Sequence, residues 1–156
     1  MATPTATEQV YLSWDRFAQL LESLTKSLLD AHEAEPFDRV VGISRGGLPL
    51  AVPISHRLRV PLTPVEIKSY KDDRSQGEVQ CETPLEVLQR CKGRVLIVDD
   101  LADSGRTSDF LLRELPRITG AAFTLATLYW KRTSTVRPDY FVEEATCWIV
   151  FPWEND

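Results

Sequence analysis

The chain has 156 residues, of which 43% are hydrophobic and 26% are charged, and its formal net charge is -5 at pH 7. This length suits a single domain over residues 1–156 with a sizeable core, and the acidic balance argues against nucleic acid as a partner. No apolar stretch approaches the roughly 20 residues of a membrane span, the N-terminus lacks a signal-peptide pattern, and three cysteines form no Cys-x-x-Cys pair, so we expect a soluble cytoplasmic protein.

The first predicted element is an amphipathic helix that begins after Ser13. Ser13 is suited to the N-cap position, and Asp15 stands in the first turn. Large apolar residues then recur at the helical spacing, so one face should pack on the core. They are Phe17, Leu20, Leu21, Leu24, Leu28 and Leu29. We interpret this helix as scaffold.

A short strand over residues 38–43 runs into Ser44-Arg45-Gly46-Gly47, and a helix is expected over residues 48–58. Glycines let the backbone approach a ligand closely, and Arg45 offers a charged fork for phosphate oxygens. The loop is neither a Walker loop nor a G-x-G-x-x-G loop. A glycine-rich turn with a surface arginine and no ligand accounts for the same residues.

Residues 64–68 form the next predicted strand, and residues 69–83 are a long polar stretch that begins with Ser69-Tyr70. Loops of this length are usually either disordered or functional lids. From composition alone, a flexible solvated loop and a lid over a binding site both stay open.

The most informative stretch runs from Arg94 to Thr107. Val95-Leu96-Ile97-Val98 is a continuous apolar run, which is typical of a parallel strand buried on both faces. Ligands of such sheets bind beyond the carboxyl ends of the strands, where Asp99 and Asp100 stand. The following helix start, residues 103–107, offers unpaired N–H groups for a phosphate. Together these features indicate a ribose phosphate as ligand.

Simpler interpretations exist for the same residues. The two acids can be merely solvated, and Asp103 or Ser104 can merely cap the helix. The ordered pattern of residues 95–107, however, resembles the signature for phosphoribosyl pyrophosphate (PRPP) of the type I phosphoribosyltransferases. This resemblance implies an α/β fold with a parallel, Rossmann-like sheet and a small hood formed largely by the C-terminal segment, about residues 131–156.

The chain after this signature is read as alternating helix and strand. Thr107 or Ser108 is expected to cap a helix that ends between Pro116 and Gly120, and a strand over residues 121–130 delivers Lys131. Residues 138–142 resemble a strand of the same family, which predicts a strand there. A lysine at a strand end is usually just solvated, and Trp148 is equally suited to the core.

Several of these segments resemble the 6-oxopurine members of the same family. Ser44 to Gly47 resembles their pyrophosphate loop, in which the peptide before the arginine position can be cis, and Ser69-Tyr70 resembles the start of their mobile lid. The ending Trp148-Ile149-x-x-Pro-Trp resembles bacterial xanthine-guanine enzymes. The PRPP-binding residues implied are Ser44, Arg45, Gly46, Gly47, Ser69, Tyr70, Asp99, Asp100, Ser104, Gly105, Arg106 and Thr107.

The resemblance also implies the reaction. A 6-oxopurine (guanine, xanthine or hypoxanthine) and PRPP would give the nucleoside monophosphate and pyrophosphate in purine salvage, with magnesium (Mg²⁺) as cofactor and Asp100 as its ligand. Asp103 would be the catalytic base, Lys131 would bind the 6-oxo group, and Trp148 would stack on the purine beside the Ile149 backbone. Related enzymes are homodimers or homotetramers.

Three alternatives stay open at this point. A PRPP-sensing regulator would keep the phosphate loop without needing Lys131 and Trp148, and an enzyme for adenine or a pyrimidine would differ at the base pocket. A receiver-type signalling domain also uses paired acids and a lysine, but its acids stand near the N-terminus, unlike the pair at 99–100. Two departures from the family pattern are Arg106 in the phosphate loop and Arg132 after Lys131.

Overall fold

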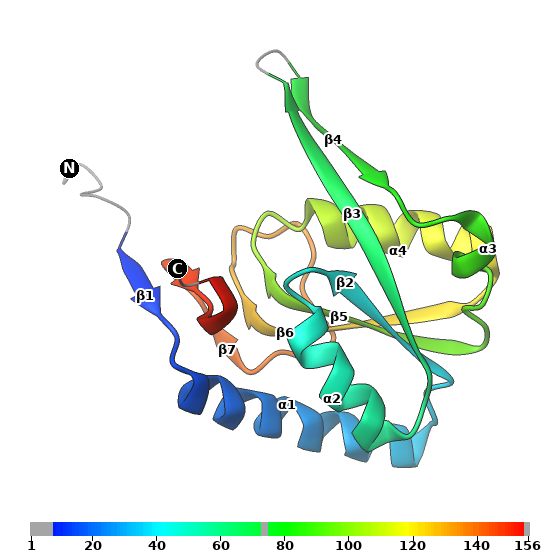
Figure 1. Cartoon of the computed structure of the whole chain (residues 1–156), viewed down its shortest axis with the longest axis horizontal. Helices are drawn as coiled ribbons and strands as arrows, with labels where there is room; N and C mark the ends of the chain where they lie inside the picture. The colour runs from blue at the N-terminus through cyan, green and yellow to red at the C-terminus, as the bar shows by residue number, and fades with distance from the viewer. Residues whose placement is uncertain (1–7, 73–74, 155–156) are drawn as a thin grey trace.

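The computed structural model describes residues 8–72 and 75–154 and has a six-stranded sheet with helices on both faces (Figure 1). Strand order is β4-β3-β2-β5-β6-β7; all neighbours are parallel except β3 and β4. The strands are β1 Gln9–Tyr11, β2 Arg39–Ser44, β3 Leu62–Asp72, β4 Ser75–Cys81, β5 Arg94–Ala102, β6 Ala122–Trp130, β7 Glu143–Glu144 and β8 Trp148–Val150. The helices are α1 Trp14–Ala34, α2 Leu48–Leu58, α3 Leu85–Leu88, α4 Arg106–Thr119 and the 3-10 helix η1 Pro152–Glu154.

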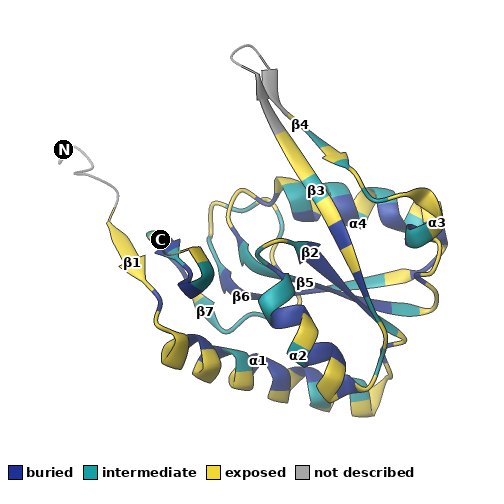
Figure 2. Ribbon diagram, viewed as in Figure 1, coloured by how far each residue is buried: buried dark blue, intermediate teal, exposed yellow. Residues whose placement is uncertain are grey.

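Strand β5 is buried on both faces, as its apolar run predicts (Figure 2). Val95 and Ile97 pack into the core on the side of α3 and α4, while Leu96 and Val98 pack into the core on the side of α1 and α2. Because β5 lies between β2 and β6, its carboxyl end is at the middle of the sheet edge. The predicted parallel α/β fold is confirmed.

The two helices predicted ahead of the signature are also confirmed. The Ser13 hydroxyl accepts the Arg16 N–H at 3.1 Å and so caps α1, and α2 covers the expected residues 48–58. Phe17, Leu20, Leu24 and Leu28 of α1 are buried. No helix among the described residues is long and apolar enough to cross a membrane.

The prediction of an irregular loop over residues 69–83 is wrong. Strand β3 extends to Asp72 and pairs antiparallel with β4, with Ile67 opposite Cys81 and Ser69 opposite Val79, so that the two strands rise together away from the sheet (Figure 1). The composition is polar because much of this ribbon lies at the sheet edge, where Ser69 is exposed to solvent. Residues 73–74 and the side chains of residues 70–77, including that of Tyr70, lie outside the described part.

Helix α4 differs from its prediction at its start and agrees with it at its end. It begins at Arg106 after Gly105, whose φ is 81°, so neither Thr107 nor Ser108 is the cap. It ends at Thr119, within the predicted range, and Gly120 follows with a φ of 72°, the left-handed conformation that glycine adopts readily.

The strand predicted over residues 138–142 is reduced to one β-bridge between Tyr140 and Ala126, and β7 follows it. The Asp139 carboxylate accepts the Leu125 N–H at 2.8 Å. It thereby replaces the backbone carbonyl of a neighbouring strand at that point of β6, which explains why the ladder is interrupted.

The hood is built from both ends of the chain. Strands β1 and β8 form a two-stranded parallel sheet beside the start of α1 (Figure 1). Ile149 and Phe151 pack into the same core cluster as α1 and β6. The C-terminal contribution is therefore as expected, whereas the contribution of β1 was not predicted.

Candidate active site

The carboxyl ends of β2, β5 and β6 lie at one edge of the sheet, because β5 pairs in parallel with both neighbours. The loops that leave β5 and β6 are hydrogen-bonded to each other. The Lys131 N–H donates to the Ala102 carbonyl and the Thr135 N–H donates to the Ser104 carbonyl, each at 3.0 Å. The predicted site residues thus lie together at the carboxyl ends of parallel strands, which is where α/β sheets bind their ligands.

The glycine-rich loop after β2 packs directly against Asp100. The Ser44–Arg45 peptide is cis, and the Gly47 N–H donates to the Ile43 carbonyl at 2.8 Å. A Cβ placed on Gly46 would overlap the Asp100 carboxylate, and one on Gly47 would overlap the Val98 carbonyl oxygen. Both positions therefore need glycine for close approach of this loop to the end of β5.

A cavity of about 1290 Å³ opens between this loop, the end of β5 and the C-terminal η1. Its polar wall includes Ser44, Arg45, Gly46, Asp99, Asp100 and Thr107, all of which were predicted as site residues. Glu154 also lines it and was missed by sequence reasoning. The only sequence signal for Glu154 is that it follows Trp153 at the end of the matched C-terminal motif.

A smaller pocket of about 100 Å³ lies at the start of α4 and is lined by residues of the predicted phosphate loop, including Ser104 and Arg106. Gly105 is held tightly, because a Cβ there would stand 2.6 Å from Ser134 Oγ. The first N–H groups of α4 and the positive end of its dipole point to this pocket, so it is suited to one phosphate group. Thr107 lines both this pocket and the large cavity.

The two adjacent carboxylates are held in an unfavourable environment. Burial raises the pKa of Asp99 well above its ordinary value, and the charge of Asp100 raises it further. Burial also raises the pKa of Asp100; hydrogen bonds with Asp99 and with the Leu101 N–H oppose this rise, and the charge of Glu154 adds to it. A ligand that brings hydroxyl donors or positive charge to this point would relieve the repulsion.

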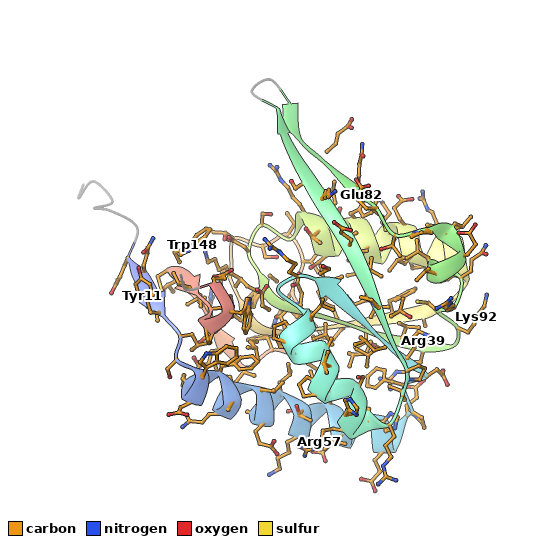
Figure 3. The ribbon with its side chains drawn as sticks, in the orientation of Figure 1. Tyr11, Arg39, Arg57, Glu82, Lys92 and Trp148 are labelled. Carbon is orange, nitrogen blue, oxygen red and sulfur yellow. The ribbon has the colours of Figure 1, made fainter. Side chains whose placement is uncertain are left out.

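The residues predicted for base binding also meet. Lys131 Nζ lies 3.3 Å from Asp103 Oδ1 and 5.9 Å from the ring centroid of Trp148. The side chain of Trp148 is half-exposed on β8 (Figure 3), whereas that of the next residue, Ile149, is buried. A cation, a carboxylate and an aromatic face thus stand together beside the phosphate pocket.

The predicted lid residue Ser69 lines neither of the two pockets described above, and the side chain of Tyr70 lies outside the described part. Ser69 lies exposed on β3, and from that strand Ile67 lines the large cavity. Arg132, the second departure from the family pattern, points away into solvent and pairs with Glu144 at 2.5 Å. The site is thus assembled from the loops after β2, β5 and β6 and from the C-terminal segment.

Comparison with known proteins gives one consistent family. The profile of the phosphoribosyl transferase domain matches residues 9–155. A xanthine-guanine phosphoribosyltransferase of Idiomarina loihiensis is 30% identical over 149 residues, which covers 94% of this chain and 87% of that protein.

Solved structures agree in fold. A purine phosphoribosyltransferase from Pyrococcus horikoshii superposes with a TM-score of 0.79 at 33% identity, covering 95% of each chain. The xanthine-guanine-hypoxanthine phosphoribosyltransferase of Helicobacter pylori superposes with a TM-score of 0.81 at 24% identity, covering 94% of each chain. The second likeness bears on the fold alone.

Proposed function

The chain belongs to the phosphoribosyl transferase domain family, and from that premise we propose that it transfers the 5-phosphoribosyl group of PRPP to a 6-oxopurine in purine salvage. Guanine, xanthine and hypoxanthine are the candidate acceptors. The observation that carries this proposal is the contact of Lys131 with Asp103 and Trp148 beside the phosphate pocket. A PRPP sensor would need the pocket but not this group of side chains.

PRPP would span the edge of the sheet. The 5′-phosphate would occupy the pocket of residues 104–107, and the pyrophosphate would lie on Arg45, Gly46 and Gly47 in the large cavity. The carboxylates of Asp99 and Asp100, between these two points, would accept hydrogen bonds from the ribose hydroxyls and place negative charge beside the cationic sugar. Ser69 and Tyr70 would close over PRPP from the β3–β4 hairpin and exclude water.

Magnesium fits the donor set of this cavity. Asp100 and Glu154 offer hard carboxylate oxygens, and the charge of Glu154 acts on the pKa of Asp100. Among the described residues, no three His, Cys, Asp or Glu side chains form a metal site on their own. This agrees with the usual magnesium site of one or two carboxylates completed by substrate oxygens. When bound, the ion supplies positive charge beside the leaving pyrophosphate.

The base would lie between the hood and the edge of the sheet. Trp148 offers a half-exposed ring for stacking, and Lys131 offers an ammonium to the 6-oxo group. Asp103 would be the catalytic residue that accepts the N7 proton as N9 attacks C1′, an effect worth roughly 10²–10⁴-fold in rate. Ile149 would contribute backbone groups to the purine edge.

Pyrophosphate release from PRPP, magnesium and each of guanine, xanthine, hypoxanthine, adenine and uracil tests the proposal directly. We expect turnover with the 6-oxopurines and little with adenine, which lacks the oxygen for Lys131. Faster turnover with adenine or uracil would reject the acceptor class. PRPP binding without turnover of any base would instead indicate a sensor.

The Asp103→Asn variant should turn over at least a hundredfold more slowly while it still binds PRPP. Asp109→Asn, in the first turn of α4 and paired with Arg113 at 3.3 Å on the surface, is the matched control and should stay active. Near-normal turnover of Asp103→Asn would remove Asp103 as the base.

Three further properties remain predictions: a single domain over residues 1–156, a cytoplasmic location, and a homodimeric or homotetrameric assembly. Analytical ultracentrifugation would test the assembly.

A further inference from the structure

We propose that the N-terminal strand β1 is a positioning element of the base pocket, because its pairing with β8 turns the backbone groups of Ile149 toward the purine. This inference rests on the proposed function. It adds β1, which contains none of the site residues assigned above. The role proposed for β1 concerns the affinity for the base, whereas PRPP is proposed to bind at the sheet edge.

The register of the hood sheet carries the argument. Gln9 lies opposite Trp148, Val10 opposite Ile149 and Tyr11 opposite Val150, all in parallel. The Trp148 N–H donates to the Glu8 carbonyl at 3.1 Å, and the Leu12 N–H donates to the Val150 carbonyl at 2.8 Å. In a parallel ladder such bonds use alternate residues of each strand.

Trp148 and Val150 therefore direct their peptide groups to β1, and Ile149, between them, directs its N–H and C=O to the opposite edge of β8. Side chains alternate in the same way. The Ile149 side chain is buried in the core, while that of Trp148 is 50% exposed and lies near Lys131. A shift by one residue would exchange these roles and hide the Ile149 peptide under β1.

Strand β1 holds this register through its backbone. Val10 is 40% exposed and Tyr11 is 67% exposed, and the sticks of Tyr11 and Trp148 lie on the two neighbouring strands at the edge of the molecule (Figure 3). The strand is anchored one residue later, where Leu12 is buried against the core before α1 begins. Apolar burial thus fixes one end of β1, and backbone hydrogen bonds align the strand with β8.

This distinction allows a test with two proline variants. The register places the Val10 amide opposite the Trp148 carbonyl, so Val10→Pro removes a donor from the ladder. Gln9→Pro places the same ring one residue away, where the amide points out of the ladder, and is the matched control. Val10→Ala keeps the amide and controls for the side chain.

We expect Val10→Pro to raise the KM for guanine about 3- to 10-fold, the factor associated with one backbone hydrogen bond, with the KM for PRPP within about twofold of the parent. Gln9→Pro and Val10→Ala should resemble the parent enzyme. Direct titration with PRPP should show that the core of Val10→Pro is folded and competent.

An unchanged guanine KM in Val10→Pro, an equal rise in the KM of both substrates, a matching defect in Gln9→Pro, or loss of PRPP binding in Val10→Pro would each overturn the inference. Failure of the proposed function has a different signature. In that case the parent protein itself would form no nucleotide from PRPP and any 6-oxopurine.

Discussion

Replacing Lys131 by methionine tests the base pocket most directly. Lys131 stands at the end of β6 with its side chain only 16% exposed, 3.3 Å from Asp103 and 5.9 Å from the Trp148 ring centroid. Methionine keeps the length and the apolar stem but removes the ammonium, so packing against Trp148 is largely retained. The loss therefore falls on the hydrogen bond to the 6-oxo group.

The size of the effect follows from the chemistry of that bond. A hydrogen bond in which one partner is charged contributes about 1.5–3 kcal/mol, which corresponds to roughly 10- to 150-fold in kcat/KM for the purine. The residues proposed for PRPP lie on other loops, so the KM for PRPP should change by less than about threefold. The Lys131→Met variant also loses the contact with Asp103. A decrease in kcat is expected in addition if the ammonium orients the Asp103 carboxylate.

Steady-state kinetics are measured with guanine varied at saturating PRPP and then with PRPP varied at saturating guanine. The two series give the KM for guanine and the KM for PRPP separately. Arg132→Met is the control, because Arg132 is the next residue, also cationic, and its side chain is 77% exposed in a surface ion pair with Glu144. Equal losses for guanine and PRPP, or the same loss in Arg132→Met, would refute the assigned role of Lys131.

Three further predictions concern the rest of the site. Trp148→Ala should raise the purine KM about tenfold, since base stacking on an aromatic ring contributes about 1–3 kcal/mol, and an unchanged KM would assign Trp148 to packing alone. Gly46→Ala, whose Cβ would overlap the Asp100 carboxylate, should raise the KM for PRPP more than about tenfold; unaltered PRPP kinetics would contradict it. Burial raises the pKa of Asp99, so ionisation of this carboxyl group destabilises the folded protein at pH values above that pKa. This penalty is absent below about pH 4, where Asp99 is protonated in the folded and in the unfolded protein. Asp99→Asn should therefore raise Tm at pH 7 in the absence of ligands, lose that gain toward pH 4, and reduce turnover; a gain that is independent of pH would reject the electrostatic cause.

The centre of the site could be predicted because local sequence determines it. Four consecutive apolar residues before Asp99 require a strand with both faces covered, and the two core clusters show Val95 and Ile97 on one face and Leu96 and Val98 on the other. Once that strand is central and parallel, its carboxyl end has to carry the site. The glycine-rich loop after β2 follows by the same argument.

Features that depend on distant pairing could not be read in this way. Residues 64–68 of β3 were predicted as a strand, but the rest of the β3–β4 ribbon has too few apolar residues to show strand alternation. Its two strands are defined by their pairing with each other, as between Ser69 and Val79. The start of α4 depends on Gly105, which has a φ of 81°, has no capping side chain and lies so close to Ser134 across the loop that a Cβ would not fit. Glu154 reaches the cavity only because the end of the chain folds back over the sheet edge.

The same contrast explains how the site divides its work. Most groups proposed for PRPP follow the buried central residues of β2 and β5 directly. The groups proposed for the purine come partly from β8, whose register depends on a three-residue strand from the other end of the chain. Sugar-phosphate binding should therefore tolerate changes in the hood, whereas base affinity should respond both to pocket residues and to backbone changes in β1. Acceptor preference can thus change by substitutions that leave the chemistry at the phosphoribosyl group intact.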